Sequence, residues 1–481
     1  MAERLHTQNY INGEWCDAAL GAVFPVDNPA TKELIEEVAD STTTDVERAI
    51  DAAYDAFAFW STTSPIERAR LLHRWFCLIV EHTDVLANLM TRECGKPFVE
   101  SKGEVAYGAS FVEWFAEEAK RIYGDIIPAA TPDRQLLVHK APIGVCAAIT
   151  PWNFPLAMIT RKCAPALAAG CTVVVKPAEG TPLTALALAA LAEQAGFPAG
   201  VFNVVCAAHG VEVGRVLSTH EKVRKLSFTG STAVGKQLLK QSAETVKRVS
   251  MELGGNAPFI VFDDADLEQA IQGALASKYR NSGQTCVCAN RFIVQDTVYE
   301  QFAERLKEAT EALKVGNGLD AGIAIGPLIN GAAVGKVSEL VRCAINDGAR
   351  ALCGAQTHSA GDNFYMPTVL TEVSPSMAIA STEIFGPVST LIRFTEEAEA
   401  IHIANATPFG LAAYFYTEDR HRMWRVADAL DYGMIGVNEG IISTTLAPFG
   451  GQKQSGMGRE GSMYGIDEYL ELKYVCMGGM K

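Results

Sequence analysis

One cysteine and one glutamate, about one helix apart in the chain, have the residue types needed for nucleophilic catalysis. Cys286 ends the small polar loop Gly283–Cys286 (GQTC), and Glu252 stands alone between apolar residues ahead of a Gly-Gly pair. A cysteine nucleophile needs a neighbour that moves protons, which a glutamate can do. The alternatives are a loop cysteine without a role and a glutamate that forms a salt bridge at a strand end.

A strand and a helix are expected to bring these two residues together. The apolar run Pro258–Phe262 predicts a buried strand, and Ala265–Tyr279 predicts a helix with apolar residues on one face. Because the helix runs back alongside the strand, we expect Glu252 and Cys286 to meet at one end of this strand–helix unit. The apolar neighbours of Glu252 should raise its pKa toward the working pH of a general base.

Two arginines flank the predicted site. Arg161 follows the loop Pro151–Pro155 (PWNFP) on an otherwise apolar helix, and Arg280 precedes Cys286. Each arginine alone is more often salt-bridged or solvated. Together they could hold a carboxylate through forked hydrogen bonds. The sequence therefore favours a substrate that carries a carboxylate.

A phosphate-binding turn is suggested by the segment Phe228–Gly235 (FTGSTAVG), which follows a predicted strand and opens a predicted helix at Ser231. Free N–H groups and the helix dipole at such a start suit a pyrophosphate. The segment lacks the common GxGxxG pattern, so it is weak support on its own. A plain strand-to-helix turn is the alternative.

The remaining chain has the pattern of an α/β protein. From Val145 onward, short apolar runs alternate with Ala-rich helical stretches such as Pro182–Ala195, which predicts a parallel sheet. A second α/β series follows Glu252 and reaches about Val437. The sequence thus predicts two α/β domains in series.

The N-terminal part is predicted to be mostly helical, with a strand-like excursion after it. Thr44 and Glu47 predict a capping box for a helix that ends at Trp60, and Glu104–Tyr123 predicts a further long helix. Asp125–Lys140 predicts protruding strands. Ile466–Val475 predicts a last strand that could pair with another subunit.

Bulk composition excludes some classes of partner. The 481 residues predict two or three domains, and 48% hydrophobic with 20% charged residues are ordinary for a soluble enzyme. A net charge of −15 argues against nucleic acid or an anionic membrane as the main partner. Twelve cysteines, mostly isolated, indicate a reducing compartment. We expect a cytoplasmic protein without a membrane span, or a mitochondrial-matrix protein if a presequence was removed.

The segments Met251–Phe259 (MELGGNAPF) and Tyr279–Cys286 (YRNSGQTC) resemble the glutamate and cysteine signatures of the NAD(P)-dependent aldehyde dehydrogenases. The resemblance covers essentially the whole chain, and the longer motifs are most similar to the succinate-semialdehyde dehydrogenase group. It implies an α/β fold with two parallel-sheet domains plus a small β oligomerisation element. The implied ranges are 1–123 and 143–254 for NAD binding, 255–454 for catalysis, and 124–142 and 466–481 for oligomerisation.

The resemblance also implies the catalytic roles. Cys286 would attack the aldehyde carbon to give a thiohemiacetal, and hydride loss would leave a thioester. Glu252 would activate the water that hydrolyses the thioester. Asn153 and the Cys286 N–H would form an oxyanion hole, in which one donor is typically worth about 3 kcal/mol. The alternative for Asn153 is a turn-forming residue.

The cofactor implied by the resemblance is NAD. NADP is possible but less favoured, because the charge of Glu179 would repel a 2′-phosphate. Lys176 and Glu179 would lie at the adenine ribose, and Glu383 and Phe385 at the nicotinamide ribose and ring. The predicted cofactor-binding residues are Trp152, Lys176, Glu179, Gly230, Ser231, Leu253, Glu383 and Phe385. No metal site is predicted.

The substrate implied by the same group is succinate semialdehyde, with Ser443 joining Arg161 and Arg280 at its far carboxylate. Glutarate semialdehyde, one methylene longer, is the alternative, and a non-catalytic binding protein on the same fold is a remote one. The expected partners are the semialdehyde and further copies of the chain, as a dimer or tetramer.

A second thiol, Cys288, lies two residues after the predicted nucleophile. Some members of the resembled group are switched off by a disulfide between such a pair, which implies a redox role for Cys288 here. The ring closed by this disulfide would be small and strained, hence easily reduced. The alternative is a buried small residue without a redox role.

Overall fold

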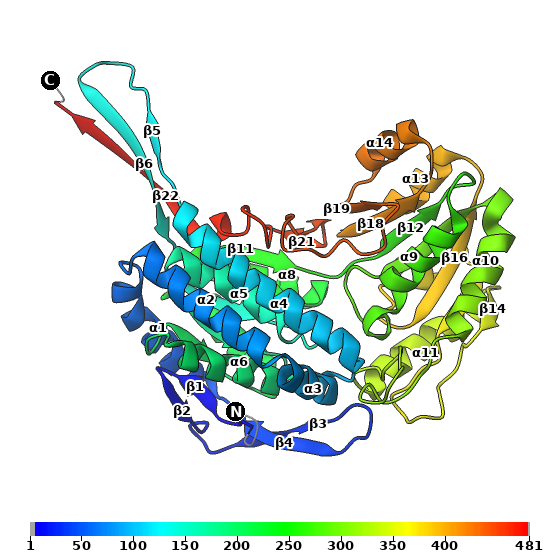
Figure 1. Cartoon of the computed structure of the whole chain (residues 1–481), viewed down its shortest axis with the longest axis horizontal. Helices are drawn as coiled ribbons and strands as arrows, with labels where there is room; N and C mark the ends of the chain where they lie inside the picture. Colours follow the sequence, from blue (N-terminus) through cyan, green and yellow to red (C-terminus); the bar gives the residue numbers. More distant parts are fainter. Residues whose placement is uncertain (1–4, 480–481) are drawn as a thin grey trace.

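Two α/β lobes and a protruding β arm make up the molecule (Figure 1). This computed structural model describes residues 5–479, so residues 1–4 and 480–481 of the predicted domain ranges lie outside it. The predicted α/β class, with two largely parallel sheets and a small β element, is confirmed. Within the described range, each helix is too short or too polar to cross a lipid bilayer.

An eight-stranded sheet builds the first lobe. Its order is β2-β1-β9-β8-β7-β10-β11-β21; the strands from β9 to β11 run parallel and the flanking ones antiparallel. A tight turn at Asn12-Gly13, both with positive φ, joins its first two strands. The bounds are Asn9–Ile11 (β1), Glu14–Cys16 (β2), Val145–Ile149 (β7), Thr172–Lys176 (β8), Phe202–Val204 (β9), Val223–Thr229 (β10), Arg248–Glu252 (β11) and Gly456–Met457 (β21).

Helices cover both faces of this sheet, because both faces are apolar. On β7, Val145 and Ala147 join a core with α1, α7 and α8, whereas Cys146 and Ala148 join a core with α2 to α6. Such continuous apolar strands are typical of buried parallel sheets. The helices are Thr43–Trp60 (α1), Pro65–Glu81 (α2), Thr83–Cys94 (α3), Phe98–Glu118 (α4), Ala157–Ala169 (α5), Pro182–Ala195 (α6), Gly210–Thr219 (α7) and Thr232–Ser242 (α8).

Two predicted helix starts are wrong. Helix α1 is capped by Thr42 and Asp45, not by Thr44 and Glu47; the carboxylate of Asp45 accepts from the Thr42 N–H at 2.9 Å. Helix α4 begins at Phe98, directly after Pro97, and ends earlier than predicted, before the short 3₁₀ turn Ala119–Arg121.

A seven-stranded sheet builds the second lobe. Its order is β14-β15-β16-β13-β12-β18-β19, parallel except for the β14–β15 pair. The strands are Ala257–Val261 (β12), Ala289–Gln295 (β13), Arg350–Cys353 (β14), Thr368–Thr371 (β15), Val388–Phe394 (β16), Ala412–Tyr416 (β18) and Met434–Val437 (β19). The helices are Leu267–Tyr279 (α9), Asp296–Glu311 (α10), Gly331–Asn346 (α11), Ala378–Ser381 (α12), Glu397–Asn405 (α13) and Arg420–Ala429 (α14).

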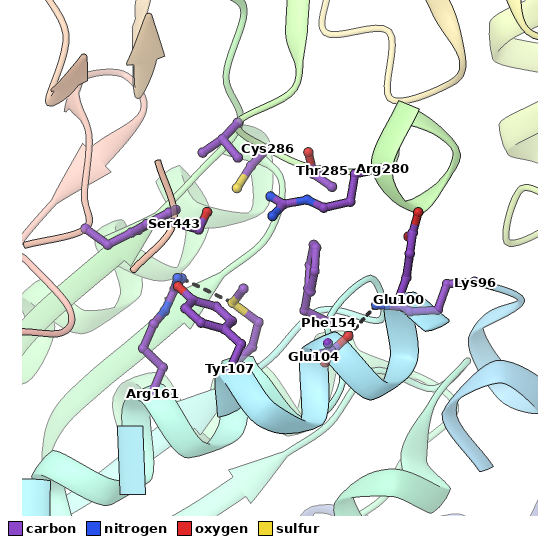
Figure 2. A pocket seen from close by; sticks show the side chains of 14 residues that line it. Lys96, Glu100, Glu104, Tyr107, Phe154, Arg161, Arg280, Thr285, Cys286 and Ser443 are labelled. Atoms are coloured by element: carbon purple, nitrogen blue, oxygen red, sulfur yellow. Dashed lines mark hydrogen bonds and ion pairs between the residues drawn. The ribbon is translucent and has the colours of Figure 1, made fainter. Parts of the chain in front are cut away.

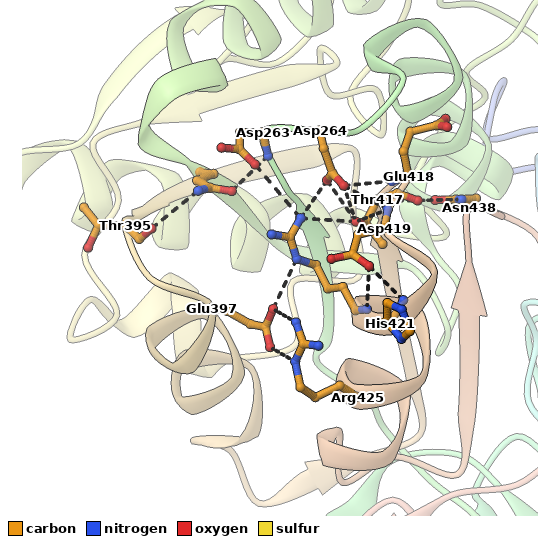
Figure 3. Close-up of polar contacts among 12 residues, drawn as sticks. Asp263, Asp264, Thr395, Glu397, Thr417, Glu418, Asp419, His421, Arg425 and Asn438 are labelled. Atoms are coloured by element: carbon orange, nitrogen blue, oxygen red, sulfur yellow. Dashed lines mark hydrogen bonds and ion pairs between the residues drawn. The ribbon is translucent and has the colours of Figure 1, made fainter.

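An ion-pair network fastens α13 and α14 to this sheet (Figure 3). Arg422 bonds Asp264 after β12 at 2.7 Å and Glu397 of α13 at 3.1 Å. Glu397 also pairs with Arg425 at 2.6 Å, and the Arg422 guanidinium lies over the ring of Phe262. The network is structural, because none of its members lines either of the two cavities described below.

The β arm extends away from the first lobe (Figure 1). It is a three-stranded antiparallel sheet of β22 (Leu470–Gly478), β6 (Arg134–Pro142) and β5 (Asp125–Ile127), in that order. Its side chains include Ile126, Leu472 and Tyr474, which are 73%, 70% and 61% exposed in the single chain. Two further pairs are the hairpin Val23–Asp27 (β3) with Leu34–Ala39 (β4), and Phe409–Gly410 (β17) with Gln452–Lys453 (β20).

The chain crosses between the lobes twice, side by side. The first crossing follows Glu252 at the end of β11, and the second precedes β21, which pairs with β11. The Leu253 N–H donates to the Ser455 carbonyl at 2.9 Å, and the Ser455 hydroxyl donates to the Gly254 carbonyl at 2.8 Å. Glu252 therefore lies directly at the junction of the lobes.

Candidate active site

Two cavities meet at Cys286, between the lobes. The first, about 250 Å³ and here named the arginine cavity, is formed by α4, α5, the turn after α9 and the loop around residue 443 (Figure 2). The second, about 260 Å³ and here named the α8 cavity, lies at the start of α8. Cys286 and Met158 line both. A group bound to this thiol can therefore face a second molecule in the other cavity.

The turn ahead of Cys286 has an unusual backbone. Asn281, Ser282 and Gly283 follow one another with φ of 50°, 56° and 75°, all in the left-handed region. This conformation costs roughly 1–2 kcal/mol for each residue that carries a Cβ. Gly255 then passes so close that an added Cβ would lie 2.4 Å from the Cys286 carbonyl oxygen. The loop that carries Cys286 is thus strained on one side and closely packed on the other.

The Cys286 thiol is held in a poorly solvated setting. Burial raises the pKa of Cys286 to about 12; Arg161 lowers it, whereas the charges of Glu383 and Glu252 raise it further. At neutral pH the resting thiol therefore keeps its proton. A nearby proton acceptor is needed before it can attack an electrophile.

Glu252 has the properties of such an acceptor. It is 2% exposed, and neither carboxylate oxygen has a hydrogen-bond partner among the described residues. Burial, and then the charge of Glu460, raise the pKa of Glu252 well above its usual range. Glu252 and Cys286 lie within electrostatic reach of one another, as predicted, but no hydrogen bond joins them in the described chain. Glu252 lines neither cavity directly.

Asn153 is fixed against the nucleophile loop. Its side-chain Nδ2 donates to the Gln284 backbone carbonyl at 2.9 Å. Its backbone carbonyl accepts from Lys96 Nζ at 2.7 Å and from Asn281 Nδ2 at 3.0 Å. Lys96 is also paired with buried Glu104. This leaves one amide hydrogen of Asn153 free for a further acceptor.

The capping of α5 also depends on Glu104, which sequence reasoning named only as a helix start. Its second oxygen accepts from the backbone N–H groups of Leu156 and Ala157 at 3.0 and 3.1 Å. The Lys96–Glu104 pair therefore joins the start of α5 to the loop that carries Asn153. A buried pair between neighbouring helix ends is not visible in a local sequence pattern.

The α8 cavity brings together most of the predicted cofactor residues. The first N–H groups of α8 lie here, and Ser231 caps the helix by accepting from Val234 N at 3.4 Å. Trp152 and Phe385 pack edge to face with centroids 5.6 Å apart. A helix N-terminus beside an aromatic pair fits a dinucleotide phosphate and ring. The predicted residues that line it are Trp152, Gly230, Ser231, Leu253, Glu383 and Phe385.

Glu383 is fixed at the floor of this cavity. Its Oε1 accepts from the Gly255 N–H at 2.9 Å, and its carbonyl accepts from Lys336 Nζ at 2.8 Å. Burial raises the pKa of Glu383 to about 7. Its other carboxylate oxygen remains available to accept from a ribose hydroxyl.

Lys176 and Glu179 do not line the α8 cavity. Lys176 ends β8 and Glu179 follows it; β8 is hydrogen-bonded to β7, so both residues lie at the next strand end along the same sheet edge. Lys176 is buried, with Nζ 3.5 Å from the carboxylate of Glu179, whose side chain is 59% exposed. The pair is thus placed to contact a part of a ligand that extends beyond the cavity.

Arg161 is already partly neutralised. Its Nε lies 2.5 Å from Glu460, which also accepts from Lys162 at 2.6 Å. Burial alone would raise the pKa of Glu460, but the charges of Arg161 and Lys162 outweigh it and lower the pKa to about 2. The Arg161 guanidinium lies over the ring of Phe449. Two buried cations thus share one carboxylate, which leaves a net positive charge on this wall of the arginine cavity.

Arg280, unlike Arg161, is a cation without a carboxylate partner among the described residues. It makes no hydrogen bond or ion pair to another described residue, and its guanidinium lies near the ring of Phe154. Figure 2 shows this guanidinium directed toward Cys286, with Ser443 across the cavity. The structure therefore brings Arg161, Arg280 and Ser443 together around one cavity, as predicted. Glu100 and Tyr107 also line it and were not predicted.

Cys288 lines neither cavity. The Thr285 hydroxyl donates to its sulfur at 2.7 Å, and the thiol donates to the Lys278 carbonyl at 3.3 Å. Lys278 itself is buried, which lowers its pKa to about 8. In the reduced state, Cys288 is therefore occupied by contacts on the α9 side of the loop.

Comparison with known proteins identifies the class. The aldehyde dehydrogenase family model matches residues 15–475, and the chain belongs to this family. The chain is 57% identical to the NADP(+) succinate-semialdehyde dehydrogenase GabD of Escherichia coli, over 98% of each protein. It is 57% identical to a glutarate-semialdehyde dehydrogenase of Pseudomonas putida, over 99% of this chain and 98% of that protein. A crystal structure of an E. coli NADP-dependent enzyme matches with a TM-score of 0.98 and 57% identity, over 98% of each chain.

Proposed function

We propose that this aldehyde dehydrogenase oxidises an aldehyde with a carboxylate at its far end, with succinate semialdehyde as the main substrate. The observation that carries the proposal is the arginine cavity, in which the uncommitted guanidinium of Arg280 is directed toward the Cys286 thiol. A carboxylate held there would present its aldehyde end to the sulfur. The relatives that act on succinate and glutarate semialdehydes support this choice.

In the proposed mechanism, Glu252 takes the thiol proton as Cys286 Sγ bonds to the aldehyde carbon. The negative oxygen that forms accepts from the free amide hydrogen of Asn153 and from the Cys286 N–H. The residues that line the α8 cavity would hold NAD, which would supply the acceptor for the hydride lost from that carbon. Glu252 passes the thiol proton to solvent while a thioester remains on Cys286, and it then takes a proton from the water that attacks the thioester. The C–S bond then breaks, which releases the acid and restores the thiol.

Glutarate semialdehyde is the second candidate substrate. One methylene changes binding in a cavity by about 1–3 kcal/mol, so both compounds are expected to turn over. The matching identities to relatives with either name favour neither by themselves. Comparing kcat/KM for the two semialdehydes assigns the main substrate.

The cofactor we propose is NAD, with NADP used less well. The support is Glu179, whose exposed carboxylate would accept from ribose hydroxyls and repel a 2′-phosphate. Glu179→Gln should raise kcat/KM with NADP relative to kcat/KM with NAD. Equal use of both cofactors by the wild type would show that Glu179 does not determine the choice between NAD and NADP.

The β arm is proposed to join copies of the chain in a dimer or tetramer. It carries exposed apolar side chains on strands that extend from the body, which a partner would cover. Light scattering of the purified protein tests this directly.

A reducing compartment, first of all the cytoplasm, suits the twelve free cysteines of the chain.

The test of substrate charge uses two aldehydes of similar length. Arg280→Ala should raise KM for succinate semialdehyde by roughly 10- to 100-fold, since a hydrogen bond to a charged group is worth about 1.5–3 kcal/mol. Uncharged butyraldehyde should be almost unaffected. Exposed Arg305 on α10, changed to Ala, is the matched control. Equal losses on both aldehydes would mean that Arg280 has only a structural role.

A further inference from the structure

The strained turn at Asn281–Gly283 is held across the junction between the lobes. Glu100 of α4, in the first lobe, accepts from the Asn281 N–H at 2.7 Å. The Asn281 side chain donates to the Asn153 carbonyl, also in the first lobe, at 3.0 Å. The bond to Glu100 has a carboxylate acceptor, and such bonds are roughly twice as strong as neutral ones. The first lobe thus holds both the backbone and the side chain of Asn281.

The second lobe holds the following residues of the same loop. The Ser282 hydroxyl donates to the Gly326 carbonyl at 3.0 Å, and Gln284 Nε2 donates to the Pro327 carbonyl at 3.3 Å. A backbone that costs free energy persists only where its surroundings over-determine it. The Glu100 bond therefore opposes relaxation of the turn at its first left-handed residue.

The charges of Glu100 and Arg280 interact, but the two side chains are not in direct contact as an ion pair. No ion pair joins the two among the described residues, and Figure 2 shows the carboxylate reaching the backbone beside Arg280 while the guanidinium points away toward Cys286. Glu100 nevertheless lies in the wall of the arginine cavity. Its hydrogen bond and its charge can therefore be separated by substitution.

We propose that Glu100 is a positioning residue that fixes the left-handed turn and thereby sets Cys286 against Asn153. The inference rests on the proposed role of Cys286 as the nucleophile. A displacement of about 1 Å in such a group can cost on the order of 100-fold in rate. The hydrogen bond of Glu100 controls the reaction with every aldehyde, whereas its charge changes only the binding of charged ones.

Three substitutions of Glu100 separate these effects. Glu100→Gln keeps an acceptor oxygen at the same reach, so kcat with butyraldehyde should stay near the wild-type value. Removing the charge beside Arg280 should lower KM for succinate semialdehyde. Glu100→Ala and Glu100→Asp lose the bond, by deletion or by shortening, and should lower kcat/KM for both aldehydes by about 100-fold. Glu113, exposed on the same helix, is the control when changed to Gln.

A second measurement distinguishes positioning from loss of the fold. The rate of Cys286 alkylation by iodoacetamide should fall in Glu100→Ala with unchanged NAD binding. A Glu100→Gln variant as slow as Glu100→Ala, or an unchanged alkylation rate in Glu100→Ala, would overturn the inference. If Cys286→Ala keeps its activity, the proposed function fails instead, whatever the Glu100 variants do.

Discussion

The side-chain amide of Asn153 donates to the carbonyl of Gln284 at 2.9 Å, which joins the end of a first-lobe strand to the loop that carries Cys286. One amide hydrogen is thus used to fix the residue, and the other remains for substrate. The donor of the proposed oxyanion hole is therefore fixed in place before an aldehyde arrives. Preorganised donors of this kind are worth more than mobile ones, because nothing needs to reorganise during the reaction.

Loss of this donor should slow the chemical step. Asn153→Ala is expected to lower kcat by about 100- to 1,000-fold, as for other single oxyanion donors. Asn153→Asp keeps the shape but replaces the donor with a carboxylate, so it should be at least as slow. Steady-state kinetics with NAD binding as the control measures this. An unchanged kcat in either variant would remove Asn153 from the mechanism.

The covalent mechanism predicts different kinetic defects when Cys286 and Glu252 are substituted. Cys286→Ala should abolish NADH formation with NAD binding intact. Glu252→Gln should form one NADH per active site more slowly than the wild type, because the thiol loses its proton acceptor, and should then stall, because the thioester is not hydrolysed. Stopped-flow absorbance at the NADH band resolves the burst. A wild-type protein that binds NAD but oxidises no aldehyde would instead favour a non-catalytic binding protein.

The pH dependence of turnover should report Glu252. A base acts only when deprotonated, and the pKa of Glu252 is raised by burial and by Glu460. Where thioester hydrolysis limits the rate, kcat should therefore rise with pH well past the usual glutamate range. The Glu252→Gln variant, followed in its slow phase, should lack this rise. A flat wild-type profile from pH 5 to 9 would contradict the assignment.

Glu460 should contribute strongly to stability at neutral pH. Its folded pKa of about 2 lies below the ordinary value of 4.5, so its stabilisation is full above about 4.5 and is lost as the pH falls toward 2. Glu460→Gln leaves Arg161 and Lys162 buried without their carboxylate, which typically costs about 3–5 kcal/mol. Urea unfolding at pH 7 measures the loss. A variant as stable as the wild type would mean that these cations find other partners.

The pair Cys286 and Cys288 should act as a reversible switch. Peroxide converts the reactive thiolate to a sulfenic acid, and attack by the second thiol releases water and forms the disulfide. Cys288 must first leave Thr285 and the Lys278 carbonyl. Dithiothreitol should restore wild-type activity, whereas Cys288→Ala should be driven to irreversible acids by the same dose. If both proteins recover equally, the switch is absent.

The grouping of the candidate site residues was predictable where these residues lie in short loops at strand ends. Each of three candidate residues lies in a local pattern with Gly or Pro close by: Cys286, Glu252 and Asn153. The structure brings them together at the junction of the lobes. Glu460 could not be found this way. Its partner Lys162 is 298 residues distant in the chain, and nothing local to either residue indicates the pair.

The fold was predictable from periodicity, except where tertiary contacts choose among local options. Thr42, Thr43 and Thr44 offer three adjacent caps for α1; Asp45 selects the first, because its carboxylate also accepts from the distant Ala19 N–H at 2.9 Å. The first turns of α4 were missed as well. They carry Glu100, whose partner is a backbone N–H 181 residues away in the second lobe.

The two crossings between the lobes have a consequence for motion. Ser455 on the returning segment bonds both Leu253 and Gly254 on the outgoing one, next to Glu252. A double, hydrogen-bonded connection of this kind resists the clamshell opening that a single flexible hinge permits. Access for ligands must then come from small displacements of loops and side chains around the mouths of the cavities. We therefore expect the distance between Glu252 and Cys286 to change little while ligands enter and leave.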